Sequence, residues 1–228
     1  MIQGTLHPIT QYLRRVIAIF KTMSFEILDS PEVVSEKHNF NDLLIPAHHP
    51  ARSLHDTFWL IDGRLPRTQT SAHQIPAMCN RKPPVRFLIP GRVFRNEATD
   101  ATHETTFHQL EGFVIDTTVS FAHLKGTLTE FIHKLYGADA SVRFVPGYFP
   151  FVEPGLEVFM QIKGSWLEIG GAGMIHPGVL KNMGVDPEHF QGYAFGMGIE
   201  RLVMLLHGID DVRLFYSGNL RFLKQFKR

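Results

Sequence analysis

Gly91-Arg-Val-Phe-Arg-Asn-Glu97 and Phe107-His-Gln-Leu-Glu-Gly112 are the two stretches that decide the fold of this 228-residue chain. Apolar and β-branched residues in and around them predict two strands, over Val85–Asn96 and Thr106–Asp116. Residues 98–105 between the strands are rich in Thr, Asp, His and Glu, a composition that suits a mobile flap over a ligand. The two stretches therefore predict a strand pair that carries a binding site.

Two charged side chains, Arg95 and Glu97, stand two positions apart at the end of the first stretch. On a strand they face the same way, so they can together hold a carboxylate or phosphate and a base amino group. A cross-strand surface salt bridge is the alternative for an isolated Arg-x-Glu. A second segment, near the C-terminus, favours the binding interpretation.

That segment is Gly192-Tyr-Ala-Phe-Gly-Met-Gly-Ile-Glu-Arg201, which continues into Leu202-Val-Met-Leu-Leu206. Its glycines alternate with apolar residues, which predicts a strand with bare backbone against a ligand, leading into a helix that ends at Gly208. An arginine at the start of that helix can reach a triphosphate or stack on a purine. A tightly packed strand–helix junction is the alternative for this segment alone.

Together the segments resemble motifs 2 and 3 of the class II aminoacyl-tRNA synthetases, at about residues 85–116 and 192–207. The resemblance extends from about Leu6 to Lys227 and puts motif 1 at about residues 8–31, where family members often carry Gly at the position of Ser24. Further stretches are similar to the alpha-subunit family of bacterial phenylalanine–tRNA ligases: Phe40-Asn-Asp-Leu-Leu44, His48-His-Pro-Ala-Arg52, His55-Asp-Thr-Phe-Trp59, Arg67-Thr-Gln-Thr-Ser71, Tyr148-Phe-Pro-Phe-Val-Glu-Pro154 and Asn219-Leu-Arg-Phe-Leu-Lys-Gln-Phe-Lys227.

The resemblance implies a site that joins a carboxylate to the α-phosphate of ATP. Such a reaction needs positioning and positive charge rather than a nucleophilic side chain. Phe107 and Arg201 would cover the two faces of the adenine, and Glu97 would hold its amino group. The residues assigned to ATP are Arg95, Glu97, His103, Phe107, Gly198 and Arg201, with Arg95 and Arg201 as the catalytic pair.

The resemblance also implies a phenylalanine pocket. Alternate aromatics, Phe149 and Phe151, point to one face and can meet a substrate ring edge to face, although ordinary core is the alternative for them in isolation. Ala194 would limit the depth at the para position. Position 69 varies between His and Gln in the family and is Gln here, so its role stays open. The residues assigned to the amino acid are Ser71, Gln74, Gln109, Glu111, Phe149, Phe151, Val152, Ala194 and Gly196.

Phe107, Gln109 and Glu111 share one face of the predicted second strand, so they can converge on one ligand. A cross-strand polar pair is the alternative for Gln109 and Glu111. Mg²⁺ bound with ATP is implied as the cofactor, with Glu157 and Glu168 as candidate supports. Glu168 is preferred because it precedes Gly170-Gly171 on a strand.

The family resemblance implies tRNA(Phe) as a further substrate, a beta subunit as partner, and a homodimer seam through motif 1. We expect residues 1–228 to form a single catalytic domain without the N-terminal tRNA-binding helical arm, and therefore to bind tRNA weakly. Net charge is +1, whereas a chain that grips tRNA by itself would show a basic excess. A local excess at Arg221, Lys224, Lys227 and Arg228 fits a solvated tail.

Composition limits the class of protein further. Hydrophobic residues make up 44% and charged residues 20%, which fits one packed globular domain. No stretch approaches the length of a membrane span, and the single Cys79 fits a reducing, cytoplasmic compartment. His48, His49 and His55 invite a zinc interpretation, but without Cys and the usual spacing, hydrogen-bonding loop histidines are the better account.

The remaining periodicities predict one antiparallel sheet flanked by helices, an α+β fold. Helices are expected from Pro8 to Met23, after a Ser120 cap as far as Gly137, and over Pro177–Met183. Further strands are expected over three ranges: Val142–Val145, Glu157–Ile162 and Trp166–Ile169.

Two classes of function remain open: an enzyme that activates phenylalanine with ATP, and a non-catalytic class II paralogue that serves as a binding or assembly module. Intact Arg95, Glu97 and Arg201 favour the enzyme. A ligase that makes a different amide or ester is a third alternative, which the Phe-lined pocket disfavours for polar substrates.

Overall fold

A central sheet organises the computed structural model, which describes residues 4–162 and 164–226. Within those residues the sheet has seven strands in the order β1-β4-β5-β9-β8-β7-β6. All neighbouring pairs are antiparallel except β1 and β4, which run parallel. The strands are β1 (Glu26–Ile27), β4 (Val85–Phe94), β5 (Thr106–Asp116), β6 (Val142–Phe149), β7 (Val152–Ile162), β8 (Ser165–Ile175) and β9 (Gln191–Gly198).

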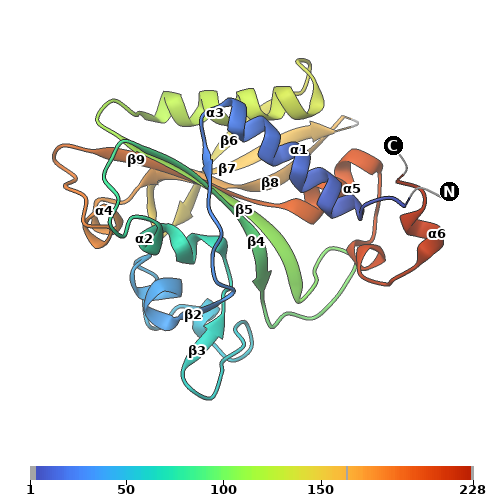
Figure 1. Ribbon diagram of the computed structural model, residues 1–228, viewed down its shortest axis with the longest axis horizontal. Helices are drawn as coiled ribbons and strands as arrows, with labels where there is room; N and C mark the ends of the chain where they lie inside the picture. Colours follow the sequence, from blue (N-terminus) through green and yellow to red (C-terminus); the bar gives the residue numbers. More distant parts are fainter. Residues whose placement is uncertain (1–3, 163, 227–228) are drawn as a thin grey trace.

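Three helices cover one face of this sheet: α1 (Pro8–Thr22), α3 (Phe121–Tyr136) and α5 (Ile199–His207) (Figure 1). Apolar residues at helical spacing on α1, including Val16 and Phe20, are fully buried. The ring of Phe20 stacks on Phe131 of α3 at 4.7 Å and on Phe195 of β9 at 5.5 Å between centroids. This aromatic cluster joins the helical layer to the sheet.

The C-terminal segment, with the helical turn η4 (Val212–Phe215) and α6 (Leu220–Leu223), lies against the start of α1 (Figure 1). His7 Nε2 is 2.9 Å from the carbonyl oxygen of Phe215, and the Gln11 amide donates to the carbonyl of Phe226 at 3.1 Å. The basic end predicted from the sequence includes Lys227 and Arg228, which lie outside the described residues.

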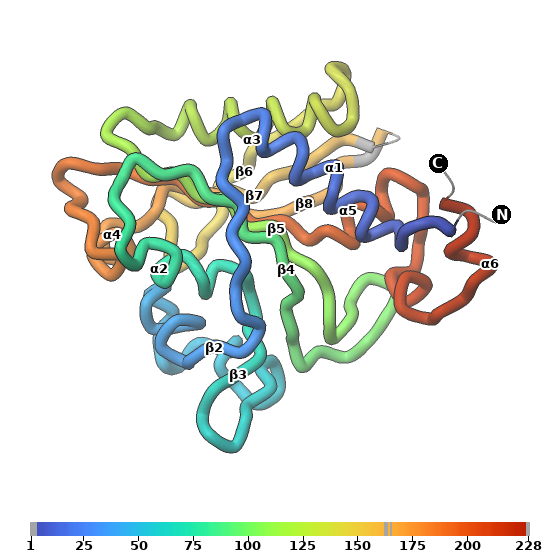
Figure 2. Tube along the Cα trace, viewed as in Figure 1, coloured from blue at the N-terminus to red at the C-terminus, as the bar shows by residue number. Residues whose placement is uncertain are grey.

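Smaller elements cover the opposite face, and Figure 2 shows the chain passing from α1 through β1 to reach them. A second core forms there, with Phe40, Phe87, Phe113, Val152 and Ala194 among its members. The elements are the hairpin of β2 (Val33–Ser35) and β3 (Arg64–Pro66), the helices α2 (Gln74–Ala77) and α4 (Pro177–Asn182), and the short helical turns η1 (Lys37–Asn41), η2 (Pro50–Arg52) and η3 (Thr70–His73).

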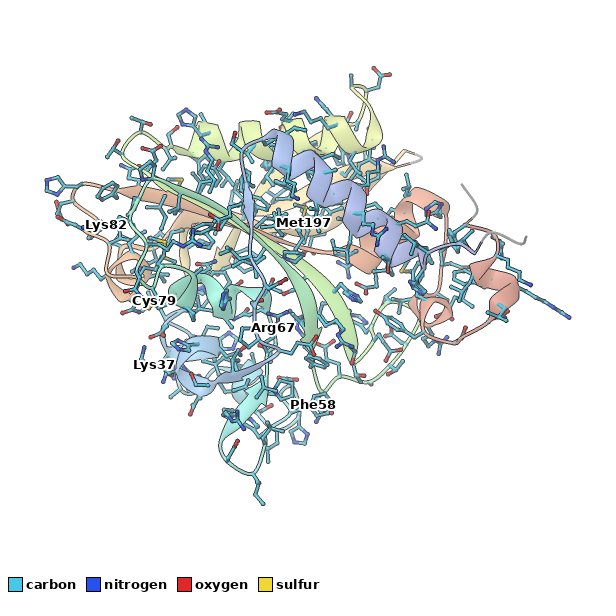
Figure 3. All side chains as sticks on the ribbon, in the orientation of Figure 1. Lys37, Phe58, Arg67, Cys79, Lys82 and Met197 are labelled. Atoms are coloured by element: carbon cyan, nitrogen blue, oxygen red, sulfur yellow. The ribbon has the colours of Figure 1, made fainter. Side chains whose placement is uncertain are left out.

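Arg67, labelled in Figure 3, is a buried cation that ties three segments together beneath the sheet. Its Nε donates to the carbonyl oxygen of Arg92 at 2.8 Å, and its Nη1 donates to the hydroxyl of Ser30 and to the carbonyl of Pro31. Burial lowers the pKa of this guanidinium. Arg67 therefore holds the segment at Ser30 and Pro31 against β4.

The α+β expectation is confirmed, with corrections to its details. The sheet is not wholly antiparallel, because β1 follows a helix rather than a hairpin and is free to run parallel to β4. The first motif strand ends at Phe94 instead of Asn96. Ser120 occupies the cap position of α3, yet its hydroxyl contacts His123 Nδ1 at 2.9 Å rather than a backbone N–H.

Other expected elements are present with different lengths. The strands β6, β7 and β8 are each longer than the apolar runs that predicted them, and α4 ends one residue early at Asn182. Ser24 has φ 64°, the left-handed region, which residues other than glycine adopt only occasionally. Within the described ranges, no helix is long and apolar enough to cross a membrane.

Candidate active site

A cavity of about 300 Å³ opens on the face of the sheet that carries the second core. We call it the central cavity. It brings together nine of the residues that the sequence assigned to ligands: Ser71, Arg95, Gln109, Glu111, Phe149, Phe151, Val152, Ala194 and Gly196. The rest of its lining consists of Ile45, His49, Gln69, Tyr148, Pro150, Gly171, Ala172 and Phe195.

One end of the central cavity is polar, because β5 presents alternate residues Gln109 and Glu111 to it. The hydroxyl of Ser71 donates to Glu111 Oε2 at 2.7 Å, and the amide of Gln74 donates to Glu111 Oε1. Gln109 Oε1 accepts the backbone N–H of Thr70 at 3.2 Å. The η3 turn therefore holds both β5 side chains in fixed orientations.

The carboxyl group of Glu111 is 3% exposed, and among the described residues no cation contributes to its pKa. Burial raises its pKa from the ordinary value of 4.5 to about 7, and the hydrogen bonds from Ser71 and Gln74 limit that rise. An ammonium group brought into the cavity would supply the missing positive charge. The polar end is thus suited to an α-amino group.

The other end of the central cavity is apolar. Phe149 ends β6 and Phe151 lies in the β6–β7 turn, with their ring centroids 6.1 Å apart, and the buried side chains of Val152 and Ala194 also line this end. Phe149 lies over the bare backbone of β8, since a Cβ at Gly171 would be only 2.7 Å from its Cζ. The absence of a side chain at Gly171 leaves the space that the Phe149 ring occupies.

Arg95 lines the cavity from the loop directly after β4. Its Nε donates to the carbonyl oxygen of Thr68 at 3.2 Å, and its Cζ lies 5.1 Å from the ring centroid of Phe107. Burial lowers its pKa, and the carboxylates of Glu97 and Asp56 oppose that shift. A guanidinium remains charged in these surroundings.

The expectation that Arg95 and Glu97 share a strand face is wrong, because both follow the end of β4. They nevertheless approach each other, with Arg95 Nη1 at 3.8 Å from Glu97 Oε1. The loop is held by backbone pairing of Arg95 with Thr105 and of Asn96 with Asp56. Loop hydrogen bonds, not strand alternation, bring the two charges together.

The remaining predicted residues lie outside the lining of the central cavity. Gln74 supports Glu111 from behind, and Gly198 ends β9 at the start of α5. Arg201, on the first turn of α5, approaches the carbonyl oxygen of Glu168 with its Nη1 at 3.5 Å. His103 belongs to a flap turn in which its Nδ1 lies 3.1 Å from Asp100. Hydrogen bonds from the backbone N–H of Thr102 and from the His103 side chain lower the pKa of Asp100.

Glu157 and Glu168 lie on adjacent strands of the same sheet. Cross-strand register puts Glu157 opposite Gly171 and Glu168 opposite Phe159, so both carboxylates belong to the face that carries Phe149. In the part of the chain that the structure describes, no group of three or more His, Cys, Asp or Glu side chains is arranged to hold a metal. His49 is instead a cap, accepting the backbone N–H of Ala51 at 3.2 Å.

Sequence reasoning missed several lining residues. Tyr148, Pro150 and His49 occur inside stretches that resemble the family, so position within those stretches was the available signal. Gln69 was left open, and it lines the cavity while its amide donates to the carbonyl of Asn39 at 3.1 Å. Ile45 has no local signal, because only the tertiary fold brings it to the cavity.

The family described as "tRNA synthetases class II core domain (F)" matches residues 1–226 of this chain. A sheet of this architecture, an arginine in the lining of the cavity and a glycine strand leading into Arg201 agree with that class.

Curated relatives narrow the class. The chain is 52% identical over 225 residues to the phenylalanine–tRNA ligase alpha subunit of Shigella boydii serotype 18, covering 98% of this chain and 68% of the relative. It is 51% identical over 228 residues to the alpha subunits of Yersinia pestis and Yersinia pseudotuberculosis, covering 100% of this chain and 69% of each relative. This chain belongs to the phenylalanine–tRNA ligase alpha-subunit family.

Proposed function

We propose that this chain condenses L-phenylalanine with ATP to phenylalanyl-adenylate and transfers the phenylalanyl group to tRNA(Phe), as the catalytic core of a phenylalanine–tRNA ligase alpha subunit. The observation that carries this proposal is the division of the central cavity. One end offers the buried carboxyl of Glu111, and the other offers the aromatic pair Phe149 and Phe151. An amino acid with an uncharged aromatic side chain matches both ends.

In the proposed first step, a carboxylate oxygen of phenylalanine attacks the α-phosphorus of ATP, and pyrophosphate leaves with the electron pair of the broken P–O bond. Arg95 would bind the α-phosphate and the substrate carboxylate, where negative charge develops. Phe107 would stack on the adenine, Glu97 would accept from its amino group, and Arg201 would cover the other face. The contact between Arg95 and Phe107 supports this placement.

Transfer would follow when a terminal ribose hydroxyl of tRNA attacks the carbonyl carbon of the adenylate and AMP leaves. His103, in the flap, would lie near the phosphates. The backbone N–H of Val212 donates to the carbonyl of Ala101 at 2.8 Å, so the middle of the flap is anchored to the C-terminal segment.

Mg²⁺ fits the donor chemistry of this face, because a magnesium ion bound by ATP needs only one or two protein carboxylates. Glu168 and Glu157 are the proposed supports, and both belong to the face that carries Phe149. When bound, the ion neutralises phosphate charge. The aromatic and glycine residues of the central cavity would bind the amino acid without it.

The family supports further proposals about assembly. A beta subunit would be the partner, a second copy could pair through motif 1, and residues 1–228 would act as one catalytic domain that binds tRNA weakly by itself. We place the activity in the cytoplasm, where charged tRNA is used by ribosomes.

ATP–pyrophosphate exchange measured with each of the twenty amino acids tests the proposed function. We expect exchange with phenylalanine, and weaker exchange with tyrosine, at roughly a hundredth to a thousandth of the phenylalanine efficiency. A preference for a polar amino acid would overturn the substrate assignment. Exchange with none of the twenty would support the alternative of a non-catalytic paralogue.

A further inference from the structure

Glu200 is a buried carboxylate that the proposed reaction does not use. It is 3% exposed, and its oxygens accept the backbone N–H of His108 at 2.8 and 3.0 Å. The imidazole Nδ1 of His108 lies 2.6 Å from Glu200 Oε1, and the hydroxyl of Tyr216 donates to the same oxygen. Three donors from two distant segments thus converge on one carboxylate.

The position of this cluster in the chain gives it significance. His108 directly follows Phe107, and Glu200 directly precedes Arg201. The pairing of β5 with β9 ends at Gln109 and Gly198, so the N–H of His108 lies one residue beyond the last paired position. The Glu200 carboxylate accepts that N–H where the ladder has stopped and the chain has turned into α5. Phe107 and Arg201 are therefore joined by a short bridge.

We propose that Glu200, acting through His108 and Tyr216, fixes the spacing between Phe107 and Arg201 and thereby sets the affinity of the site for the adenine ring of ATP. Glu200 is a positioning residue, since its carboxylate is buried and its oxygens are bonded to His108 and Tyr216. The inference rests on the proposed function only in taking Phe107 and Arg201 as the two sides of an adenine site.

Packing of α5 alone would not need this carboxylate. Ile199, Leu202 and Val203 are fully buried and already hold the helix on the sheet. Burying a charged group is costly unless it is hydrogen-bonded, and an apolar side chain would anchor the helix as well. What the carboxylate adds is direction, because each of its donors has a defined geometry. The carboxylate therefore fixes the position and orientation of the first turn of α5 relative to β5, and Arg201 lies on that turn.

The amino-acid end has its own supports. Gln109 is paired with Gly198 in the ladder and accepts the N–H of Thr70, and Glu111 is held by Ser71 and Gln74. Loss of the Glu200 bridge should therefore shift Phe107 and Arg201 relative to each other, while the residues that bind phenylalanine stay in place. This separation supplies a readout that a general loss of stability would not give.

The test compares Glu200→Gln and Tyr216→Phe with the control Tyr12→Phe. Glutamine keeps the shape of Glu200 but retains a single acceptor oxygen, and phenylalanine removes only the Tyr216 hydroxyl. Tyr12→Phe removes another buried hydroxyl, which lies 2.6 Å from the hydroxyl of Tyr136 in the helical layer. KM for ATP and KM for phenylalanine are measured by pyrophosphate exchange, and the Kd of ATP by equilibrium dialysis.

We expect Glu200→Gln to raise the KM and Kd for ATP about tenfold and Tyr216→Phe to raise them about threefold, the effect of losing buried hydrogen bonds. KM for phenylalanine should change less than about twofold in both variants, as should all constants in Tyr12→Phe. The double variant should raise the Kd for ATP by less than the product of the two single effects, because the Tyr216 hydroxyl acts through Glu200.

An unchanged Kd for ATP in both single variants, or an equal rise in KM for both substrates, would overturn the bridge. So would additive effects in the double variant. If the unmodified chain exchanges pyrophosphate with no amino acid, the proposed function fails, while the Kd values for ATP still decide the bridge. If it exchanges with phenylalanine and the variants match it, only the bridge fails.

Discussion

Ser71 donates its hydroxyl hydrogen to Oε2 of Glu111 across 2.7 Å, in a part of the central cavity that is closed to solvent. The bond connects the η3 turn to β5. Each oxygen of the Glu111 carboxyl group accepts a hydrogen bond from one neutral donor, Oε2 from Ser71 and Oε1 from Gln74. Neutral donors stabilise a carboxylate less than a cation does. Burial therefore raises the pKa of Glu111 to about 7 despite these bonds, and two predictions depend on this shift.

The first prediction is that Glu111 contributes a loss of stability of up to about 3 kcal/mol to the ligand-free chain as pH rises from about 4.5 to about 7. Burial raises the pKa of Glu111 in the folded state, so the folded chain keeps a proton that the unfolded chain has already released. Urea unfolding at about pH 5 and about pH 8 measures the difference. Glu111→Gln should remove that part of the pH dependence, and an identical slope in the variant would contradict the assignment.

Phenylalanine affinity should change with pH in the opposite direction. The ammonium group of the substrate needs the ionised form of Glu111, so affinity should rise by about tenfold between about pH 6 and about pH 8. Titration calorimetry with L-phenylalanine measures it. The Glu111→Gln variant should bind weakly with little pH dependence. Equal affinities of the unmodified chain at both pH values would show that Glu111 does not bind the amino group of phenylalanine.

Arg95→Ala should abolish adenylate formation while leaving the fold intact. The substitution removes charge-assisted bonds where charge develops, which corresponds to about 3–4 kcal/mol of barrier. Pyrophosphate exchange measures the loss, and unfolding in urea checks the fold. A decrease of less than about tenfold would show that Arg95 does not hold the reacting groups.

Asn39→Ala should weaken both stability and catalysis, because Asn39 is fully buried and orients the residue that holds Arg95. Its amide donates to the hydroxyl of Thr68 at 2.8 Å and its oxygen accepts the Thr68 N–H at 3.1 Å, while the Thr68 carbonyl accepts from Arg95. We expect a loss of about 1–3 kcal/mol in urea unfolding together with reduced pyrophosphate exchange.

The matched control for that variant is Asn182→Ala. The Asn182 amide donates to the carbonyl oxygen of Asp42 at 2.9 Å, and neither residue contacts Arg95 through a hydrogen bond. It should reduce stability without reducing exchange in the folded population. If Asn39→Ala also exchanges normally once folded, Asn39 contributes to the fold alone.

Ala194→Gly should widen the apolar end of the central cavity and raise activity with tyrosine and with para-halogenated phenylalanines. Ala194 is 2% exposed and belongs to the cavity lining. An apolar pocket rejects an added hydroxyl by only about a hundredfold, so a small gain in space should be measurable. Pyrophosphate exchange with the three substrates compares the variant with the unmodified chain. Unchanged ratios would remove Ala194 from the para position.

Local pattern predicted the elements with an uninterrupted run of strand-forming residues. The range expected for the second motif strand, Thr106–Asp116, agrees with β5, in which residues 110–115 are all buried. The ends of β6, β7 and β8 were not predictable from apolar runs, since Pro146, Gly155 and Gly173 weaken the strand signal while cross-strand pairing maintains the ladder. Pairing partners far away in the sequence decide those lengths.

The site shows the same limit. Nine assigned residues lie together because the family resemblance carried their positions, while Glu200 and Tyr216 went unnoticed. A glutamate followed by an arginine gives no sign of which charge turns inward. The burial of Glu200 depends on where β9 stops and α5 begins, and on a tyrosine from the C-terminal segment. The burial of Glu200 is therefore set by tertiary structure and not by the local sequence.

Bare backbone beneath Phe149 also restricts how this part of the chain can change. A Cβ at Gly171 would lie 2.7 Å from that ring, and one at Gly170 would lie 2.1 Å from the carbonyl oxygen of Gly196. Because no residue is smaller than glycine, every missense substitution at these positions adds atoms to a full space. At Gly171 a larger residue fits only if Phe149 first loses bulk, which would change substrate preference, whereas at Gly170 the contact is with backbone and no change at Phe149 makes room for it.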